Sequence, residues 1–265
     1  MFKTRLLSSI VILVVMLFLV ISGGNVLLAA VSLFAMIAMM EFMRMVKLHK
    51  TPLAISCYGA VALYYILLFT DNQDKLIPLS MCYLLVLMAA YVMTFPKYKA
   101  EQMALLFFGF FYGGILLSYV YQVRMLPGGA FSVWLIFIAA WGSDVCAYCA
   151  GMLFGKHKAF PKLSPKKTWE GCIGGVIGAV VIAVLYCFAM NYWFQQNLSV
   201  GQYAIVCGCG AVISQIGDLA ASAMKRNHEI KDYGKLIPGH GGVLDRFDSV
   251  IFVAPLAFYL LQMTM

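Results

Sequence analysis

Nine long apolar runs, separated by short polar segments, make up most of this chain. They cover residues 6–22, 26–43, 53–70, 76–94, 103–121, 130–153, 172–194, 203–224 and 249–263. Each run approaches the length needed to cross a hydrocarbon core of about 30 Å, although the last is short for a span. The runs are continuous rather than alternating, and backbone groups in lipid must be paired inside a helix or a closed barrel. We therefore expect an all-α, polytopic integral membrane protein with about nine transmembrane helices.

Composition supports a membrane protein and excludes an ordinary soluble domain. Of the 265 residues, 63% are hydrophobic and 11% are charged, whereas soluble domains carry about 25% charged residues. The eight cysteines lie within or at the ends of apolar runs. We interpret them as small buried hydrophobic residues, including Cys146 and Cys149, which form a C-x-x-C pair. The first run, Leu6–Ser22, is interpreted as a retained span rather than a cleaved signal.

Basic residues alternate between the two sides of the predicted membrane. With a cytoplasmic N-terminus, 17 of the 19 Lys and Arg residues fall inside, and Lys75 and Arg124 fall outside. This asymmetry follows the positive-inside rule, and an error of one span would destroy it. We therefore expect the N-terminus in the cytoplasm and the C-terminus outside. The net charge of +8 does not indicate nucleic-acid binding, because no basic domain stands clear of the membrane.

Acidic residues divide the chain into two regions of different character. We expect residues 1–100 to form N-terminal, lipid-facing scaffold helices, and residues 101–265 to carry two cytoplasmic catalytic loops. Seven of the 11 acids lie within or beside those loops. Two of them, Asp144 and Asp218, interrupt apolar runs, at a cost of roughly 2.5–3.5 kcal/mol each. Such acids by default mark a functional site; a structural acid paired with a lysine is the alternative.

The run that contains Asp218 carries a polar stripe. At helical spacing, Gln215, Asp218, Ser222 and Lys225 share one face, and Arg226 follows directly. A polar face in a lipid-embedded helix must point into the bundle. A carboxylate, a hydroxyl and two cations in this order suit a metal ion and phosphates.

A glycine-rich segment, "LIPGHGGVLDRFDS" (Leu236–Ser249), precedes the last apolar run. Gly239, Gly241 and Gly242 would free the backbone to turn its N–H groups toward an anion. Asp245 and Asp248 are three residues apart and would share a helix face, where they could meet one Mg²⁺ ion. Two further side chains, Arg246 and His240, supply donors for phosphate oxygens.

The preceding inside loop, "FGKHKAFPKLSPKKTWEGCIGG", is basic and contains two prolines. We expect a stiff basic loop in which Lys166 and Lys167 bind a triphosphate or an acidic head group. Because these lysines lie in a loop apart from the acid cluster, we expect them to contribute to binding rather than to chemistry.

Two blocks of this sequence follow a known pattern. The first is "SAMKRNHEIKDYGKLIPGHGGVLDRFDS", Ser222–Ser249, with its S-x-x-K-R, K-D, P-G-H-G-G and D-R-x-D elements; the second is "SDVCAYCAGMLFGKHK…SPKKTWEG", Ser143–Gly171. Both blocks resemble the phosphatidate cytidylyltransferase (CDP-diacylglycerol synthase) family. Together they cover about a fifth of the chain. The resemblance implies that CTP and phosphatidate give CDP-diacylglycerol and pyrophosphate, with Mg²⁺ as cofactor and a second, monovalent cation left open. It further implies a homodimer in a bacterial inner membrane, with the active loops in the cytoplasm.

The resemblance and the residue chemistry together assign candidate roles. Asp218 and Asp245 are expected as principal Mg²⁺ ligands, with Asp248 and Asp144 as secondary or outer acids. The phosphates of CTP and lipid would be neutralised by Lys225, Arg226, His240 and Arg246. The anion-binding cradle would be completed by Ser222, Gly239, Gly241 and Gly242, with Lys166 and Lys167 binding nucleotide or head group.

Two other readings stay open at this point. A CTP-dependent lipid kinase, or a cytidylyltransferase for another lipid, needs the same Mg²⁺ and basic loops, and only the products distinguish them. An ion-coupled transporter would use intramembrane acids as its ion pathway, but the hydropathy pattern shows no inverted repeat.

Overall fold

The computed structural model describes residues 2–263, with side chains from Ser8 to Met263. In this part of the chain, each predicted apolar run is almost entirely helical. Seven helical segments are long and apolar enough to cross a membrane, and Ser8–Ser22 is a shorter apolar helix. These features describe an integral membrane protein. The count of nine spans and the orientation stay predictions. Lys3 and Arg5, two of the basic residues behind the predicted orientation, come before the first described side chain, Ser8.

Apolar side chains exposed at helical spacing indicate where lipid would contact the protein. Along the helix 169–194, Ile173, Ile177, Val181, Leu185 and Phe188 are each at least 50% exposed. A soluble protein rarely leaves a continuous apolar stripe of this length open to water. The stripe therefore fits a helix surface that faces acyl chains.

The chain folds into two compact units that are interleaved in sequence. Unit 1 contains Met1–Tyr121 and His228–Arg246, and unit 2 contains Gln122–Asn227 and Phe247–Met265. The glycine-rich segment as far as Arg246 therefore belongs with the N-terminal helices, and the basic loop belongs with the helix that carries Asp218. The functional division near residue 100 stays a prediction.

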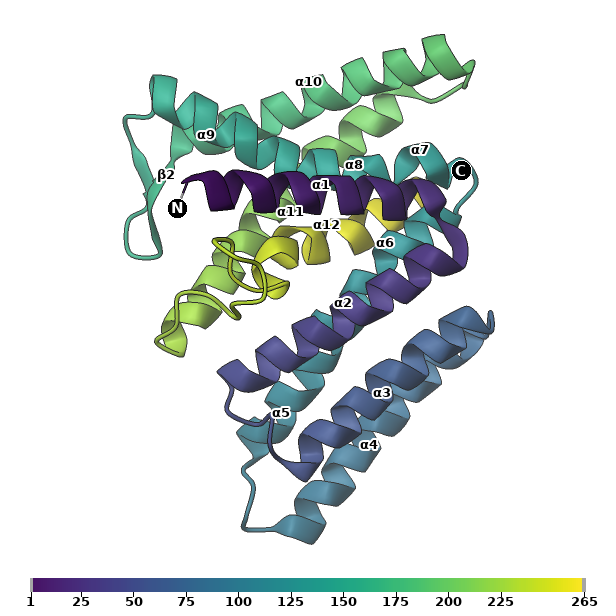
Figure 1. The fold of residues 1–265 in the computed structure, drawn as a ribbon, viewed down its shortest axis with the longest axis vertical. Coiled ribbons are helices and arrows are strands. Elements are labelled where there is room, and N and C mark those ends of the chain that lie inside the picture. Colours follow the sequence, from purple (N-terminus) through teal and green to yellow (C-terminus); the bar gives the residue numbers. More distant parts are fainter. Residues whose placement is uncertain (1, 264–265) are drawn as a thin grey trace. The chain divides into compact units, whose positions relative to one another are not determined.

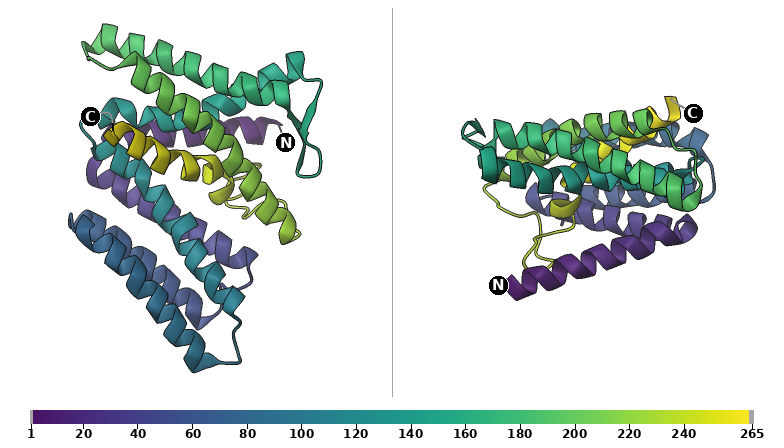
Figure 2. Two further views of the ribbon diagram at one scale, coloured as in Figure 1. Left: turned by 180° about the vertical axis from the view of Figure 1, so that it is seen from behind. Right: turned by 90° about the horizontal axis from the view of Figure 1, so that it is seen from above.

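Unit 1 is built from the first helices of the chain. In Figure 1 and in the left view of Figure 2, α3 and α4 lie side by side. Its elements are α1 (Phe2–Ser22), α2 (Gly24–Met45), α3 (Pro52–Phe69), the short 3₁₀ turn η1 (Gln73–Lys75), α4 (Leu76–Thr94), α5 (Ala100–Gly109), the π-helical turn η2 (Phe110–Ile115) and α6 (Leu116–Met125) as far as Tyr121.

Tyrosine hydroxyls of α3 contact small residues of η2 and α6 in the core of unit 1. The Tyr65 hydroxyl donates to the Gly114 carbonyl at 3.0 Å, and the Tyr64 hydroxyl lies 3.1 Å from Ser118 Oγ. A Cβ on Gly114 would lie 2.9 Å from Val61 Cγ2. The absence of a side chain at Gly114 therefore lets α3 approach η2 closely enough for these hydrogen bonds.

Unit 2 contains the two long C-terminal helices and a hairpin. Figures 1 and 2 show α9 beside α10. Its elements are α7 (Gly129–Ser132), α8 (Trp134–Phe137), the π-helical turn η3 (Ile138–Gly142), α9 (Ser143–Phe154), β1 (Lys158–Phe160), β2 (Ser164–Thr168), α10 (Trp169–Phe194), α11 (Val200–Asn227) and most of α12 (Leu244–Met263). The basic segment is thus a short antiparallel hairpin, with Lys158 paired to Thr168 and Phe160 to Ser164.

Small residues allow α9 and α10 to pack closely. A Cβ on Gly171 would lie 2.9 Å from the Ala147 carbonyl oxygen and 3.2 Å from Gly151 Cα. A Cβ on Gly175 would lie 2.9 Å from both the Ala147 Cβ and the Ser143 carbonyl oxygen. In lipid, where the hydrophobic effect does not join helices, such close packing holds them together. The packed helices α9 and α10 therefore support the hairpin that connects them.

Candidate active site

The hairpin in unit 2 is fixed to the start of α10. Thr168 caps this helix, because its Oγ1 accepts a hydrogen bond from the Gly171 N–H at 3.2 Å. The Trp169 N–H donates to the His157 carbonyl at 3.0 Å, and Glu170 Oε1 lies 2.6 Å from His157 Nδ1. These contacts hold both ends of the basic segment, so its lysines project from a defined strand.

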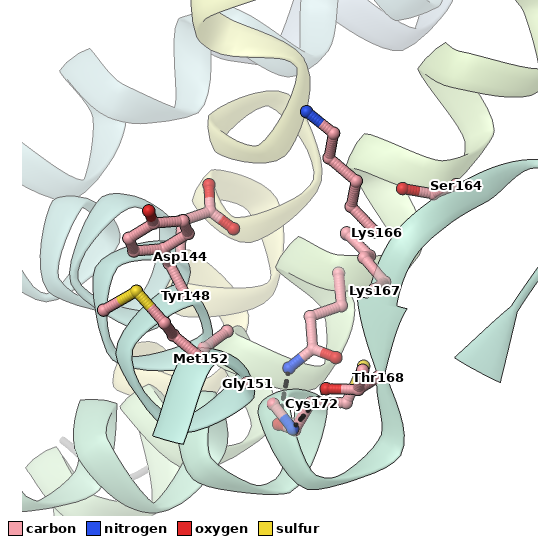
Figure 3. Close-up of a pocket in the computed structure, with 12 residues that line it drawn as sticks. Asp144, Tyr148, Gly151, Met152, Ser164, Lys166, Lys167, Thr168 and Cys172 are labelled. Carbon is pink, nitrogen blue, oxygen red and sulfur yellow. Dashed lines mark hydrogen bonds between the residues drawn. The ribbon is translucent and has the colours of Figure 1, made fainter. Parts of the chain in front are cut away.

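A cavity of about 460 Å³ lies between this hairpin and three helices of unit 2. Figure 3 shows Asp144, Tyr148 and Met152 on α9 on one side, and Lys166 and Lys167 on β2 on the other. Gln215 of α11 also lines the cavity, and its Nε2 donates to the Cys172 carbonyl at 2.9 Å. The cavity is in the size range of small-molecule sites, and it combines an acid with two cations.

Lys167 and Asp218 form a salt bridge, with Lys167 Nζ 2.6 Å from Asp218 Oδ2. The side chains are 23% and 31% exposed, respectively. The expectation that Lys167 lies apart from the acid cluster is therefore wrong. The hairpin folds back toward α11, so a lysine separated from Asp218 by about fifty residues becomes its ionic partner.

The polar face predicted for the helix around Asp218 is present on α11. Gln215, Asp218, Ser222 and Lys225 are all part of one continuous helix, and Lys225 and Arg226 occupy its last turn. A Cβ on Gly217 would lie 3.0 Å from the Asp248 backbone oxygen. The α11 segment that carries Asp218 therefore packs against the α12 segment that carries Asp248, whose side chain is buried.

The glycine-rich segment forms a tight turn in unit 1. An isolated bridge joins Ile237 to Gly241, with the Ile237 N–H donating to the Gly241 carbonyl at 2.9 Å. Gly239 and Gly241 have φ values of 78° and 85°, which a residue with a side chain rarely adopts. The turn borders a polar cavity of about 630 Å³. Its charged or titratable lining residues are Lys231, Asp232, Lys235, His240 and Arg246.

Asp245 joins the backbone before the glycine turn to the backbone after it. Its Oδ2 accepts hydrogen bonds from the Tyr233 N–H at 2.8 Å and from the Gly242 N–H at 2.9 Å. The side chain is buried, in the first turn of α12. One backbone N–H that was expected to face an anion, that of Gly242, is thus bound to the carboxylate of this chain.

Sequence reasoning missed a second carboxylate at the turn, Glu41 of α2. It is 2% exposed. It accepts hydrogen bonds from the Val243 N–H at 3.1 Å and from the Leu244 N–H at 2.8 Å. The signal was available, because Glu41 is an acid inside the apolar run 26–43. Such an acid by default marks a functional site.

The first helix also contacts the turn. Ser8 Oγ donates to the Pro238 carbonyl at 2.9 Å, and Ser9 Oγ lies 3.1 Å from His240 Nε2. Together with Glu41, these contacts tie the turn to α1 and α2. The N-terminal helices therefore support a segment whose residues were predicted to bind phosphates.

Metal binding was predicted at Asp218, Asp245, Asp248 and Asp144. Among the described residues, no group of three or more His, Cys, Asp and Glu side chains is arranged to hold a metal ion. The donor chemistry nevertheless fits Mg²⁺, which takes carboxylate oxygens and keeps waters and substrate phosphates as its other ligands. Asp218 already attracts one cation, the Lys167 ammonium. Asp218 and Asp245 belong to different units, and their shared metal site stays a prediction.

Comparison with known proteins relates the whole chain to one family. The model of the cytidylyltransferase family matches residues 3–264. A phosphatidate cytidylyltransferase of Staphylococcus haemolyticus is 34% identical over 265 residues, which cover 98% of each chain. Proteins of the same name from Staphylococcus aureus (strain COL) and Staphylococcus epidermidis are 33% and 32% identical over 269 and 268 residues. The similarity thus includes the first helices as well as the two polar segments.

Proposed function

This chain belongs to the cytidylyltransferase family, and from that premise we propose that it makes CDP-diacylglycerol and pyrophosphate from CTP and phosphatidate. It is a membrane nucleotidyltransferase of phospholipid biosynthesis. The observation that carries this function is the match to phosphatidate cytidylyltransferases over 98% of both chains. Two cavities with charged linings support it, because the substrates together carry four phosphate groups.

The reaction is a single displacement at phosphorus. A phosphate oxygen of phosphatidate attacks the α-phosphorus of CTP, and a new P–O bond joins the lipid phosphate to the cytidylyl group. The bond from the α-phosphorus to the oxygen that bridges it to the β-phosphate breaks, and pyrophosphate leaves with the electron pair. The attacking phosphate is already anionic, so no Ser or Cys nucleophile is needed. Such a reaction depends mainly on positioning and on neutralising charge.

Basic and polar side chains of this chain would bind and orient the phosphates. Arginine and lysine donors form charge-assisted hydrogen bonds to phosphate oxygens, and these are stronger than neutral ones. We assign this function to Lys225, Arg226, His240, Arg246 and Lys166, with Ser222 and the turn formed by Gly239, Gly241 and Gly242 completing the anion site. The last turn of α11 supplies Lys225 and Arg226. The cavity beside the glycine turn supplies His240 and Arg246, and β2 supplies Lys166 at the other cavity.

Carboxylates would hold a divalent cation. Asp218 and Asp245 are proposed as the principal Mg²⁺ ligands, with Asp248 and Asp144 as secondary acids. When bound, Mg²⁺ supplies positive charge that neutralises the leaving pyrophosphate and helps to orient the phosphates. Lys167 pairs with the Asp218 carboxylate and neutralises its charge. A second, monovalent cation and a homodimer are further proposals, which rest on the family resemblance alone.

Labelled nucleotides would test the reaction directly. Purified protein in lipid nanodiscs, given phosphatidate, Mg²⁺ and CTP, should transfer label from the α-phosphate into the lipid extract and release label from the γ-phosphate as pyrophosphate. A sample without phosphatidate is the control. Transfer of the γ-label into lipid would indicate a CTP-dependent lipid kinase instead. Absence of any labelled product would contradict both activities toward phosphatidate. The same assay with other lipids would then separate a cytidylyltransferase for another lipid from a transporter.

The proposed topology places both reactive segments in the cytoplasm and predicts opposite labelling at two positions. Lys235 borders the glycine turn and Lys75 follows α3, and both are exposed. In intact cells, an impermeant maleimide should label Lys75→Cys and should spare Lys235→Cys until the membrane is opened. The parent protein, labelled in parallel, corrects for its own cysteines. Labelling of Lys235→Cys from outside would overturn the orientation.

A further inference from the structure

We infer that Glu41, in the second helix, is a positioning residue that sets the glycine turn and the start of α12 for the proposed reaction. This inference rests on the proposed function. Glu41 lies 202 residues from Val243 and 203 residues from Leu244, yet its two carboxylate oxygens accept one backbone N–H each from these residues. Glu41, Val243 and Leu244 all belong to unit 1, so the contact lies within one compact unit.

The chemistry of the contact is that of a helix cap supplied by another helix. The first N–H groups of an α-helix have no partner within the helix, and a negative charge at that end is favoured by the helix dipole. Leu244 begins α12. The Glu41 carboxylate therefore satisfies two N–H groups at a position where burial excludes water, and a buried N–H without a partner would cost about 1–3 kcal/mol.

Two glycines, Gly234 and Gly242, leave room for the Glu41 carboxylate. A Cβ on Gly242 would collide with both Glu41 oxygens, and a Cβ on Gly234 would collide with Glu41 Oε1. No larger residue fits at either position without displacing Glu41. Gly242 was predicted to form part of an anion-binding cradle for substrate. Because it lacks a side chain, it also leaves space for the carboxylate of Glu41.

The contact controls residues of the proposed site through the backbone. Val243 and Leu244 come immediately before Asp245, whose Oδ2 binds the Gly242 and Tyr233 N–H groups. Arg246, which lines the cavity beside the turn, follows. Glu41 and Asp245 thus bind successive N–H groups of one short segment. A shift at Leu244 would move the carboxylate and the guanidinium that the proposed reaction uses.

The test compares Glu41→Ala and Glu41→Gln with the wild type. We expect Glu41→Ala to lower kcat about 10- to 100-fold, the range typical of residues that orient a metal ligand, with a change in the KM for CTP below about threefold. Glu41→Gln keeps the length and one acceptor oxygen, so its loss should be smaller. Hydrogen exchange, which does not depend on the reaction, should become faster at Val243 and Leu244 in both variants and stay unchanged in α3.

Matched variants separate positioning from general damage. Gly242→Ala should reproduce the kcat loss with Glu41 still present, whereas Gly59→Ala, where nothing lies within 4 Å of the added carbon, should behave as wild type. Glu101→Gln removes an exposed acid and should also be neutral. Wild-type kcat and KM per folded molecule in both Glu41 variants would overturn the inference, even with lowered thermal stability. Unchanged exchange at Val243 and Leu244 would overturn it too. If the wild-type protein formed no product, the proposed function would be rejected. The hydrogen-exchange data would still test whether Glu41 holds Val243 and Leu244.

Discussion

Replacing Asp218 or Asp245 with asparagine is expected to lower turnover at least about 100-fold, because changing even an outer-shell partner of a metal ligand costs up to about 100-fold. Asparagine keeps the size and one acceptor oxygen but removes the charge. The Asp245 hydrogen bonds to Gly242 and Tyr233 can thus be partly kept, and the protein should still fold and insert. The informative measurement is kcat as a function of Mg²⁺ concentration. Each variant should need much more Mg²⁺, and the double variant should be little worse than the poorer single, because two ligands of one ion act as a unit.

Two controls make this result specific. Asp74→Asn removes an exposed acid of the η1 turn and should leave the Mg²⁺ dependence unchanged. Asp218→Asn also leaves Lys167 without its ionic partner, so the combination Asp218→Asn with Lys167→Met removes both charges together. Recovery of normal Mg²⁺ dependence in that combination would assign the loss to the stranded lysine. Wild-type Mg²⁺ dependence and near-normal rates in both single variants would refute the shared metal site.

Lys167→Ala is expected to lower kcat about 10- to 100-fold, whereas Lys166→Ala should mainly raise the KM for a substrate. The sequence predicted a binding function for both lysines. The structure distinguishes them, because Lys167 Nζ lies 2.6 Å from Asp218 Oδ2 while Lys166 is exposed at the cavity. A residue that holds a proposed metal ligand acts as an outer-shell partner of the metal. Steady-state kinetics that vary CTP and phosphatidate separately would measure the difference.

The same hairpin offers a matched control for the lysines. Lys162 is exposed in the hairpin turn and does not line the cavity, so Lys162→Ala should keep both kcat and KM. Lys167→Arg preserves the positive charge and should recover part of the rate lost in Lys167→Ala. If Lys167→Ala raised only KM, as expected for Lys166, the salt bridge to Asp218 would have no part in turnover.

The helical membrane architecture could be predicted from the sequence because it depends on local properties. A continuous apolar run in lipid has to be helical, since its backbone groups find partners only within the run. The run 203–224 corresponds to α11 at Val200–Asn227, and the run 172–194 to α10 at Trp169–Phe194. The ends shift by a few residues where polar groups extend the helix, as at Thr168, which caps α10. The polar stripe of α11 was predicted for the same reason, because residues three and four apart share a helix face.

The contacts that arrange the site depend on the tertiary structure. Lys167 faces Asp218 because the basic segment forms a hairpin, and this pairing has no signature in either local sequence. Glu41 reaches Val243 and Leu244 because the turn packs against α2 across about two hundred residues of chain. The sequence by itself determined the helices, the polar motifs and the family. Only the tertiary structure decided which carboxylate binds a lysine and which binds backbone N–H groups, because distant partners are chosen by packing and not by periodicity.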